Sequence, residues 1–225
     1  MQEPAYLLAI DTCGPTGSVA LGRLAGEKLD ILGESTLGGR TYSANLVASV
    51  GELLSAAKVQ LPQLSAIVAV NGPGSFTGVR VGLSAVKGLA EPARLAVVAV
   101  SRLDVLAHKA QVACAALDAH RHEVFLRIGK PEARELLAGA EELAAISPAP
   151  RCIAVCDDSA ADLLAAAWPA TELVRCAAPT AADALSLALP RIVTGEFADL
   201  ALLDGHYLRR SDAEIFGEPD APPRP

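Results

Sequence analysis

One pattern occurs twice in this chain: an apolar run that ends in aspartate, a short polar turn, and then a second apolar run. The first copy is 6–10 ending at Asp11, followed by 18–22. The second copy is 112–117 ending at Asp118, followed by 123–128. Apolar runs of this length beside turn residues are typical of β-hairpins. The repeat therefore predicts two related α/β lobes, each beginning with a hairpin that carries an aspartate.

The remaining elements follow from residue spacing. After the first hairpin, the spacing of Leu46, Val50, Leu53 and Ala57 predicts a helix over 42–57. The other elements expected in the first half are strands at 29–34, 66–71 and 95–100 and a helix to about residue 90. In the second half we expect a strand at 152–156 and helices near 141, at 162–167 and from 181, where Pro190 is expected to end or kink the helix.

The 225 residues fit one large domain or two small lobes, and the repeat favours two. We expect a first lobe at 1–103, a second lobe at 104–212, and a disordered tail at 213–225, because its prolines suit neither a helix nor a ladder.

Composition narrows the class of protein. The apolar runs are far shorter than the roughly 20 residues that span a bilayer, and the N-terminal segment lacks the pattern of a signal peptide. We therefore expect a cytoplasmic protein. A net charge of −7 disfavours unaided binding to a polyanion, so any nucleic acid is expected to be held by another subunit.

Five cysteines without a CxxC pair predict reduced thiols rather than disulfides or a zinc site. Cys152 and Cys156 would share one face of a strand, where burial is favoured over metal binding.

The segment Gly72-Pro73-Gly74-Ser75-Phe76-Thr77-Gly78 directly follows an apolar strand, and Ser75 is placed to cap the next helix. A strand-turn-helix junction can hold a phosphate at the helix N-terminus. However, the segment lacks the Gly-Lys-Ser/Thr of a Walker A loop, and its third glycine is one residue late for a dinucleotide fingerprint. Anion binding and a purely structural turn both remain open.

The helix after this junction is apolar around most of its circumference. One stripe holds Val79, Leu83, Val86 and Ala90, and the adjacent stripe holds Gly78, Gly82, Ala85 and Leu89. One side can face the sheet of its own lobe. The other can be covered by helix 42–57 or by a partner chain, and both alternatives are kept.

Four motifs in this order resemble the TsaB (YeaZ) family. They are Ala9-Ile10-Asp11-Thr12 with Ser18-Val19-Ala20-Leu21, the glycine segment extended to Gly82, Asp118-Ala119 with Glu123-Val124-Phe125, and Tyr207-Leu208-Arg209. The resemblance implies a two-lobed fold of the actin, sugar-kinase and Hsp70 type (ribonuclease H-like), with mixed sheets flanked by helices.

The resemblance also implies a function. Members of this family are non-catalytic subunits in the synthesis of threonylcarbamoyladenosine (t6A) in tRNA. They pair with the transferase TsaD and activate it. The ATPase TsaE joins this complex, and the tRNA is reached through the complex. No cofactor is implied for this chain itself, since ATP and Mg²⁺ are bound mainly by the partners. A homodimer is expected when the partner is absent.

Two sets of residues carry over from the resemblance. The nucleotide-binding-like positions are Asp11, Thr12, Gly72, Gly74, Ser75 and Asp118. The partner interface is expected on the two helices of the first lobe, at Leu46, Val50, Leu53, Phe76, Gly78, Val79, Gly82, Leu83, Ala85, Val86 and Leu89. On this interpretation Gly82→Glu breaks the complex and leaves the monomer folded.

No catalytic residue and no metal site are expected. Catalytic TsaD-like relatives carry a His-x-x-x-His pair after the strand that follows the glycine helix, whereas the stretch 100–106 here has no histidine. No His-Glu-x-x-His motif occurs either. A further departure is Tyr42-Ser43, where many family members have His followed by Ser or Thr.

A small ATPase or kinase of the same fold is the alternative. In that case Asp11 and Asp118 would flank a phosphate site, with Asp11 positioning Mg²⁺ or an attacking water. Otherwise the two aspartates only cap tight turns.

Overall fold

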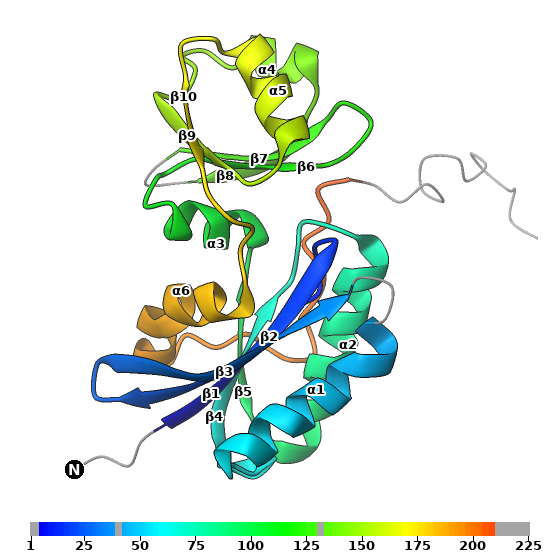
Figure 1. Cartoon of the computed structure of the whole chain (residues 1–225), viewed down its shortest axis with the longest axis vertical. Helices are drawn as coiled ribbons and strands as arrows, with labels where there is room; N and C mark the ends of the chain where they lie inside the picture. Colours follow the sequence, from blue (N-terminus) through cyan, green and yellow to red (C-terminus); the bar gives the residue numbers. More distant parts are fainter. Residues whose placement is uncertain (1–4, 39–41, 130–132, 210–225) are drawn as a thin grey trace, which may run out of the picture.

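The computed structural model describes residues 5–38, 42–129 and 133–209 (Figure 1). Within these ranges the chain forms two five-stranded mixed sheets, one above the other in Figure 1, with helices on both faces of each.

The first sheet has the strand order β3-β2-β1-β4-β5. Its strands are β1 (Ala5–Asp11), β2 (Thr16–Ala25), β3 (Lys28–Gly38), β4 (Leu64–Val70) and β5 (Ala96–Val100). Strands β1, β2 and β3 pair antiparallel, while β4 and β5 continue from β1 in parallel. Strand β4 is buried along almost its whole length, as expected for a central strand covered on both faces.

The second sheet repeats this topology. Its order β10-β9-β6-β7-β8, read in reverse, matches the first sheet strand for strand, with the same parallel and antiparallel pairs. The strands are β6 (Ala115–Asp118), β7 (Val124–Ile128), β8 (Arg134–Ala138), β9 (Cys152–Val155) and β10 (Glu172–Arg175). The repeat predicted from the two hairpins is confirmed.

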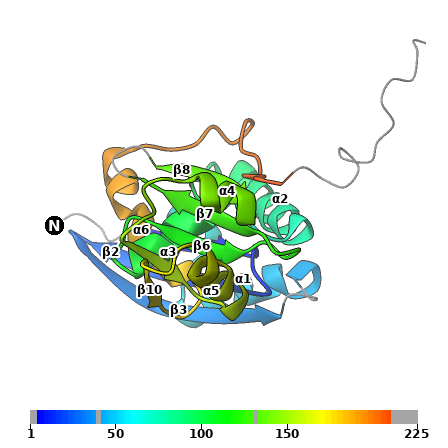
Figure 2. The same cartoon turned by 90° about the horizontal axis from the view of Figure 1, so that it is seen from above.

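The helices form three layers. Helices α1 (Tyr42–Ala57) and α2 (Phe76–Ala93) cover the outer face of the first sheet, and α4 (Ala140–Ala145) and α5 (Asp158–Ala167) cover the outer face of the second. Between the sheets lie α3 (Arg102–Lys109) and α6 (Ala181–Thr194), which pack against each other. Figure 2, seen from above, shows α1 and α2 to one side of this stack. A short 3₁₀ helix, Leu61–Gln63, precedes β4.

Several elements differ from the sequence-based predictions. Helix α3 and the short strands β8 and β10 were not predicted. Pro190 does not end its helix, which continues to Thr194. The proline removes the hydrogen bond that the Ser186 carbonyl would receive, but Ser186 is exposed and its carbonyl can bond to water.

The division into lobes at 103/104 stays a prediction. Helix α6 belongs to the second half of the sequence, yet it packs against β1, β2 and β4 of the first sheet. The predicted disordered tail, 213–225, lies outside the described residues. None of the helices in the described residues is long and apolar enough to cross a bilayer.

Candidate functional site

The glycine segment forms the predicted junction between β4 and α2. Ser75 caps the helix, because its Oγ accepts a hydrogen bond from the Gly78 N–H at 3.3 Å. Gly72 has φ of +119°, a conformation that favours glycine, and a Cβ there would lie 2.9 Å from the His206 carbonyl oxygen.

The junction packs directly against the loop that follows β1. The Ser75 N–H donates to the Cys13 carbonyl at 2.8 Å, and the Thr12 hydroxyl donates to the Gly78 carbonyl at 2.7 Å. A Cβ on Gly74 would lie 2.1 Å from the Cys13 oxygen, and one on Gly78 would lie 2.0 Å from the Thr12 oxygen. The glycines therefore allow two backbone segments of this chain to touch, which favours a structural role for the motif.

Asp11 is engaged inside the chain. Its Oδ2 pairs with Arg102 Nε at 3.3 Å, and its Oδ1 accepts a hydrogen bond from the Cys13 N–H at 2.8 Å. The side chains of Asp11 and Arg102 are only 2% and 7% exposed. Burial acts to lower the pKa of Arg102, but the Asp11 carboxylate outweighs it and holds that pKa above its ordinary value. The Arg102 N–H also donates to the Gly72 carbonyl at 2.6 Å, so the start of α3 ties both loops together.

Cys13 and Tyr42 complete this buried cluster. Burial, reinforced by the Asp11 charge, raises the pKa of the Cys13 thiol well above its ordinary value. The Tyr42 hydroxyl donates to the Gly14 carbonyl at 2.6 Å, and burial raises the pKa of Tyr42 to about 12. Tyr42, which departs from the family pattern, is thus a fixed part of the loop packing.

Asp118 makes separate contacts. Its carboxylate accepts a hydrogen bond from the His120 N–H at 2.8 Å and pairs with the His120 ring at 2.9 Å. Its own N–H donates to Asp157 Oδ2 at 3.1 Å, and Asp157 caps α5. The structure therefore brings Asp11, Thr12, Gly72, Gly74 and Ser75 together. Among the residues that the structure describes, Asp118 contacts Asp157 and His120 instead.

Sequence reasoning missed a polar cluster between the two sheets. Glu135 of β8 accepts a hydrogen bond from Ser101 Oγ at 2.6 Å and contacts His206 Nε2 at 2.9 Å and Arg127 Nη1 at 3.3 Å. Arg127 also pairs with Asp104 of α3 at 2.9 Å. No signal in one sequence joins residues so far apart. Within the described ranges, no three His, Cys, Asp or Glu side chains are grouped to hold a metal, and the five cysteines are free thiols.

The outer face of α1 and α2 is only partly made of the predicted interface residues. Leu46, Val50, Gly78, Val79, Gly82, Leu83 and Val86 are buried within this chain, whereas Leu53, Phe76, Ala85 and Leu89 are partly exposed. Val47 of α1 is 59% exposed, and a cavity of about 320 Å³ lies between the helices, bordered by Val47, Arg80, Val81 and Ala85.

The expectation for Gly82→Glu does not fit this arrangement. A Cβ on Gly82 would lie 2.3 Å from the Thr12 hydroxyl, so a glutamate there would disturb the inside of the monomer before it met a partner.

The chain has two sheets of the same topology, each lying between helices, and a glycine junction that packs on the first hairpin. These features define a two-lobed protein of the actin-like (ribonuclease H-like) α/β class. Residues 36–145 match the family model described as TsaD: tRNA N6-adenosine threonylcarbamoyltransferase.

Among known proteins, the chain is 39% identical over 125 residues to the tRNA threonylcarbamoyladenosine biosynthesis protein TsaB of Haemophilus influenzae. It is 30% identical over 148 residues to the protein of the same name from Escherichia coli. These alignments cover 53% and 63% of this chain and 51% and 62% of the two relatives, so the chain spans only about half to three fifths of their length.

A crystal structure from Pseudomonas aeruginosa, of an uncharacterized protein with similarity to peptidase YeaZ, superimposes with a TM-score of 0.73 at 30% identity. That superposition covers 91% of this chain and all of the other. Component A of (R)-2-hydroxyglutaryl-CoA dehydratase from Acidaminococcus fermentans shares the fold alone, with a TM-score of 0.51 at 12% identity over 85% of this chain and 99% of that one. The chain belongs to the TsaB (YeaZ) family.

Proposed function

We propose that this chain is a non-catalytic subunit in t6A synthesis and that it binds and activates a TsaD-type transferase. The names of its relatives support a role in tRNA threonylcarbamoyladenosine biosynthesis. The match to a transferase family model is consistent with a chain that shares the fold of its partner.

The buried Asp11–Arg102 pair is the observation that carries the non-catalytic part of this proposal. An ATPase or kinase of this fold needs a carboxylate free to position Mg²⁺ or water. Here both Asp11 oxygens already have partners, and one partner is a buried cation. A divalent ion beside Asp11 would meet the positive charge of Arg102, so the geometry favours a structural role for this aspartate.

The similarity of one structural relative to a peptidase raises a second possibility, hydrolysis. Ser101, Glu135 and His206 do meet, but Ser101 and His206 both contact Glu135. In a hydrolytic triad the serine contacts the histidine, and the acid lies behind it. This cluster therefore supports lobe packing more than nucleophilic catalysis.

The face of α1 and α2 is the proposed docking surface. It contains an exposed valine, Val47, beside the cavity between the helices. A pair of helices from a structurally related partner can pack its side chains into this cavity. Binding that favours the active state of the partner would raise the population of that state. In the full assembly a TsaE-type ATPase joins the pair and tRNA is reached through the complex. Without a partner, the same surface supports a homodimer.

Val47→Glu tests the docking surface, with Val193→Glu as a matched control. Val193 is 70% exposed on α6, on the opposite face of the first sheet, so both variants place the same charge on an exposed helix position. Burying an unpaired carboxylate at an interface, together with the loss of the valine contact, weakens association by about 3 kcal/mol or more, roughly a hundredfold.

The measurement is co-elution and titration with the TsaD-type protein of the same genome, with circular dichroism as a check on folding. We expect Val193→Glu to bind like the wild type. If Val47→Glu binds the transferase as tightly as the wild type does, α1 is not part of the interface.

The non-catalytic assignment has its own assay. The chain alone should give no t6A in unmodified tRNA, and adding it to the transferase, the ATPase and the adenylate donor should restore formation. Transfer by the isolated chain, or turnover of ATP·Mg²⁺ by it, would overturn this part of the proposal.

A further inference from the structure

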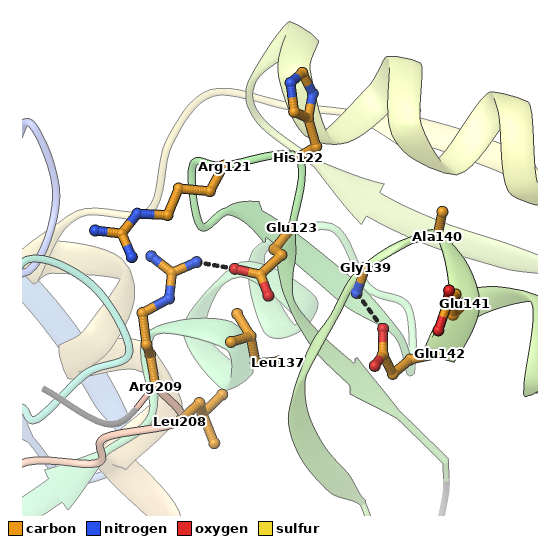
Figure 3. Close-up of a pocket in the computed structure, with 10 residues that line it drawn as sticks. All are labelled: Arg121, His122, Glu123, Leu137, Gly139, Ala140, Glu141, Glu142, Leu208 and Arg209. Atoms are coloured by element: carbon orange, nitrogen blue, oxygen red, sulfur yellow. Dashed lines mark hydrogen bonds and ion pairs between the residues drawn. The ribbon is translucent and has the colours of Figure 1, made fainter. Parts of the chain in front are cut away.

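A second cavity, of about 750 Å³, is lined by residues of the second sheet, its turns and the C-terminal segment, and the lining residues include none from α1 or α2 (Figure 3). It is bounded by the β6–β7 turn, by the end of β8 and the start of α4, and by Leu208 and Arg209 of the C-terminal segment. Cavities of about 300–1,000 Å³ are the usual size for small-molecule sites. Neither the glycine junction nor the proposed docking surface uses it.

The charges that line this cavity are unevenly distributed, with both arginines and Glu123 toward one side and Glu141 and Glu142 toward the other. Figure 3 shows Arg121 and Arg209 on one side and Glu141 and Glu142 on the other, with Leu137 between them. Arg209 contacts Glu123, and Arg121 also has an interaction of its own within the chain. A guanidinium has five donors, so each arginine can keep its present contact and hold a second carboxylate. With two arginines and three glutamates in the lining, a purely anionic ligand would meet net repulsion.

The two glutamates on the acidic side of the cavity, Glu141 and Glu142, differ in their contacts. Glu142 Oε2 accepts a hydrogen bond from the Gly139 N–H at 2.8 Å, and hydrogen bonds from its own backbone N–H and from that of Gly139 lower the pKa of the Glu142 carboxyl. Glu142 is therefore ionised and already engaged at neutral pH. Glu141, beside it, is exposed and also lines the cavity, so its carboxylate is accessible to a cation.

The turn that presents Arg121 has an unusual backbone. His120, Arg121 and His122 have φ of 60°, 57° and 60°, three successive residues other than glycine in the left-handed region. Each such residue costs roughly 1–2 kcal/mol relative to the right-handed form. The turn is held by hydrogen bonds from the Glu123 N–H to the His120 carbonyl at 3.1 Å and from the Ala119 N–H to the Glu123 carbonyl at 3.0 Å. Strain of this kind gathers at binding sites, where it fixes the direction of a side chain.

We propose that this cavity binds a short zwitterionic, peptide-like ligand, with its carboxylate against Arg121 and Arg209, its ammonium against Glu141, and its apolar part over Leu137. A ligand with both charges complements both sides of the cavity, which a simple anion or cation does not. The apolar contact adds affinity without changing the charge balance.

Tri-alanine is the probe for this site. It carries one ammonium and one carboxylate at opposite ends of a chain about 10 Å long, with only methyl side chains. The control probe is the same tripeptide with an acetylated N-terminus and an amidated C-terminus, which keeps the three alanines and removes both terminal charges. Titration is followed by amide chemical shifts of the full chain. We expect tri-alanine to shift the signals of 121–123 and 137–142 at millimolar concentration and the blocked peptide to leave them unchanged.

Arg121→Gln and Glu141→Gln should each weaken the binding of tri-alanine about two- to fivefold, because each removes one exposed charged contact. Glu172→Gln is the matched control, since Glu172 is an exposed glutamate on β10, at the opposite edge of the same sheet. Equal shifts with the blocked peptide, equal affinity in both cavity variants, or no shifts with tri-alanine would each overturn the proposal.

Discussion

Arg102→Met tests the buried ion pair that supports the non-catalytic assignment. Methionine keeps much of the length of the arginine stem but removes the charge, which leaves the Asp11 carboxylate buried without its cation. Removing one member of a buried pair costs about 3–5 kcal/mol of stability. An exposed pair is worth about 0–1 kcal/mol, and Arg23–Asp30, with side chains 44% and 30% exposed, provides that comparison through Arg23→Met.

A double-mutant cycle isolates the interaction. Asp11→Asn retains an oxygen that can accept from the Cys13 N–H but leaves the Arg102 guanidinium unpaired. Each single variant should therefore be strongly destabilised. The double variant Asp11→Asn/Arg102→Met has no unpaired buried charge and should be more stable than the sum of the two losses predicts, by about 2 kcal/mol or more.

Urea unfolding followed by circular dichroism gives the four free energies of unfolding. The free energy of unfolding of a globular domain is about 5–15 kcal/mol, so each single variant keeps enough stability to be measured. The reasoning is refuted if Arg102→Met is no more destabilised than Arg23→Met, or if the losses from the two single changes simply add.

Two further predictions concern stability. Gly82→Ala should lower the free energy of unfolding by about 1–3 kcal/mol, because its Cβ would lie 2.3 Å from Thr12 Oγ1. Gly88→Ala in the same helix meets no atom within 4 Å and should raise the free energy of unfolding by about 0.5–1 kcal/mol. Thermal unfolding of both variants measures the difference, and equal shifts would contradict the packing argument. Burial raises the pKa of the Cys156 thiol from 9.0 to about 11. The stability that the protonated thiol contributes is therefore fully present below pH 9.0 and is lost as the pH rises through about 11. The urea midpoint should fall less steeply with pH in Cys156→Ala than in the wild type, and parallel slopes would count against burial as the cause.

Residue spacing predicted the regular elements with strong local patterns. Helix α1 has the predicted bounds, Tyr42–Ala57, because its apolar stripe is continuous over four turns. The repeat of strand, aspartate and hairpin predicted two related lobes, but it did not predict the strand order within each sheet or the edge strands β8 and β10. The short strand β10, with two half-buried residues between exposed ends, has no pattern that separates it from a loop.

Helix α3 did carry a local signal. Ser101 is a good N-cap, and Leu103, Leu106 and Ala107 follow at helical spacing. The burial of Arg102 carried none, because it depends on a carboxylate that lies 91 positions earlier in the chain. The glycine segment was ambiguous for the same reason: only the position of the Cys13 and Thr12 carbonyls decides whether its backbone meets a ligand or another part of the chain.

The position of α6 imposes an order on folding during synthesis. This helix, 181–194, covers the face of the first sheet that is turned toward the second, yet that sheet is complete in sequence at Val100. At about 5–20 residues per second, the ribosome needs roughly 4–16 s to add the intervening segment. Throughout that interval an apolar sheet face stays uncovered on the nascent chain, in the form that chaperones bind. A truncated chain that stops at residue 103 would keep that face exposed permanently and should aggregate.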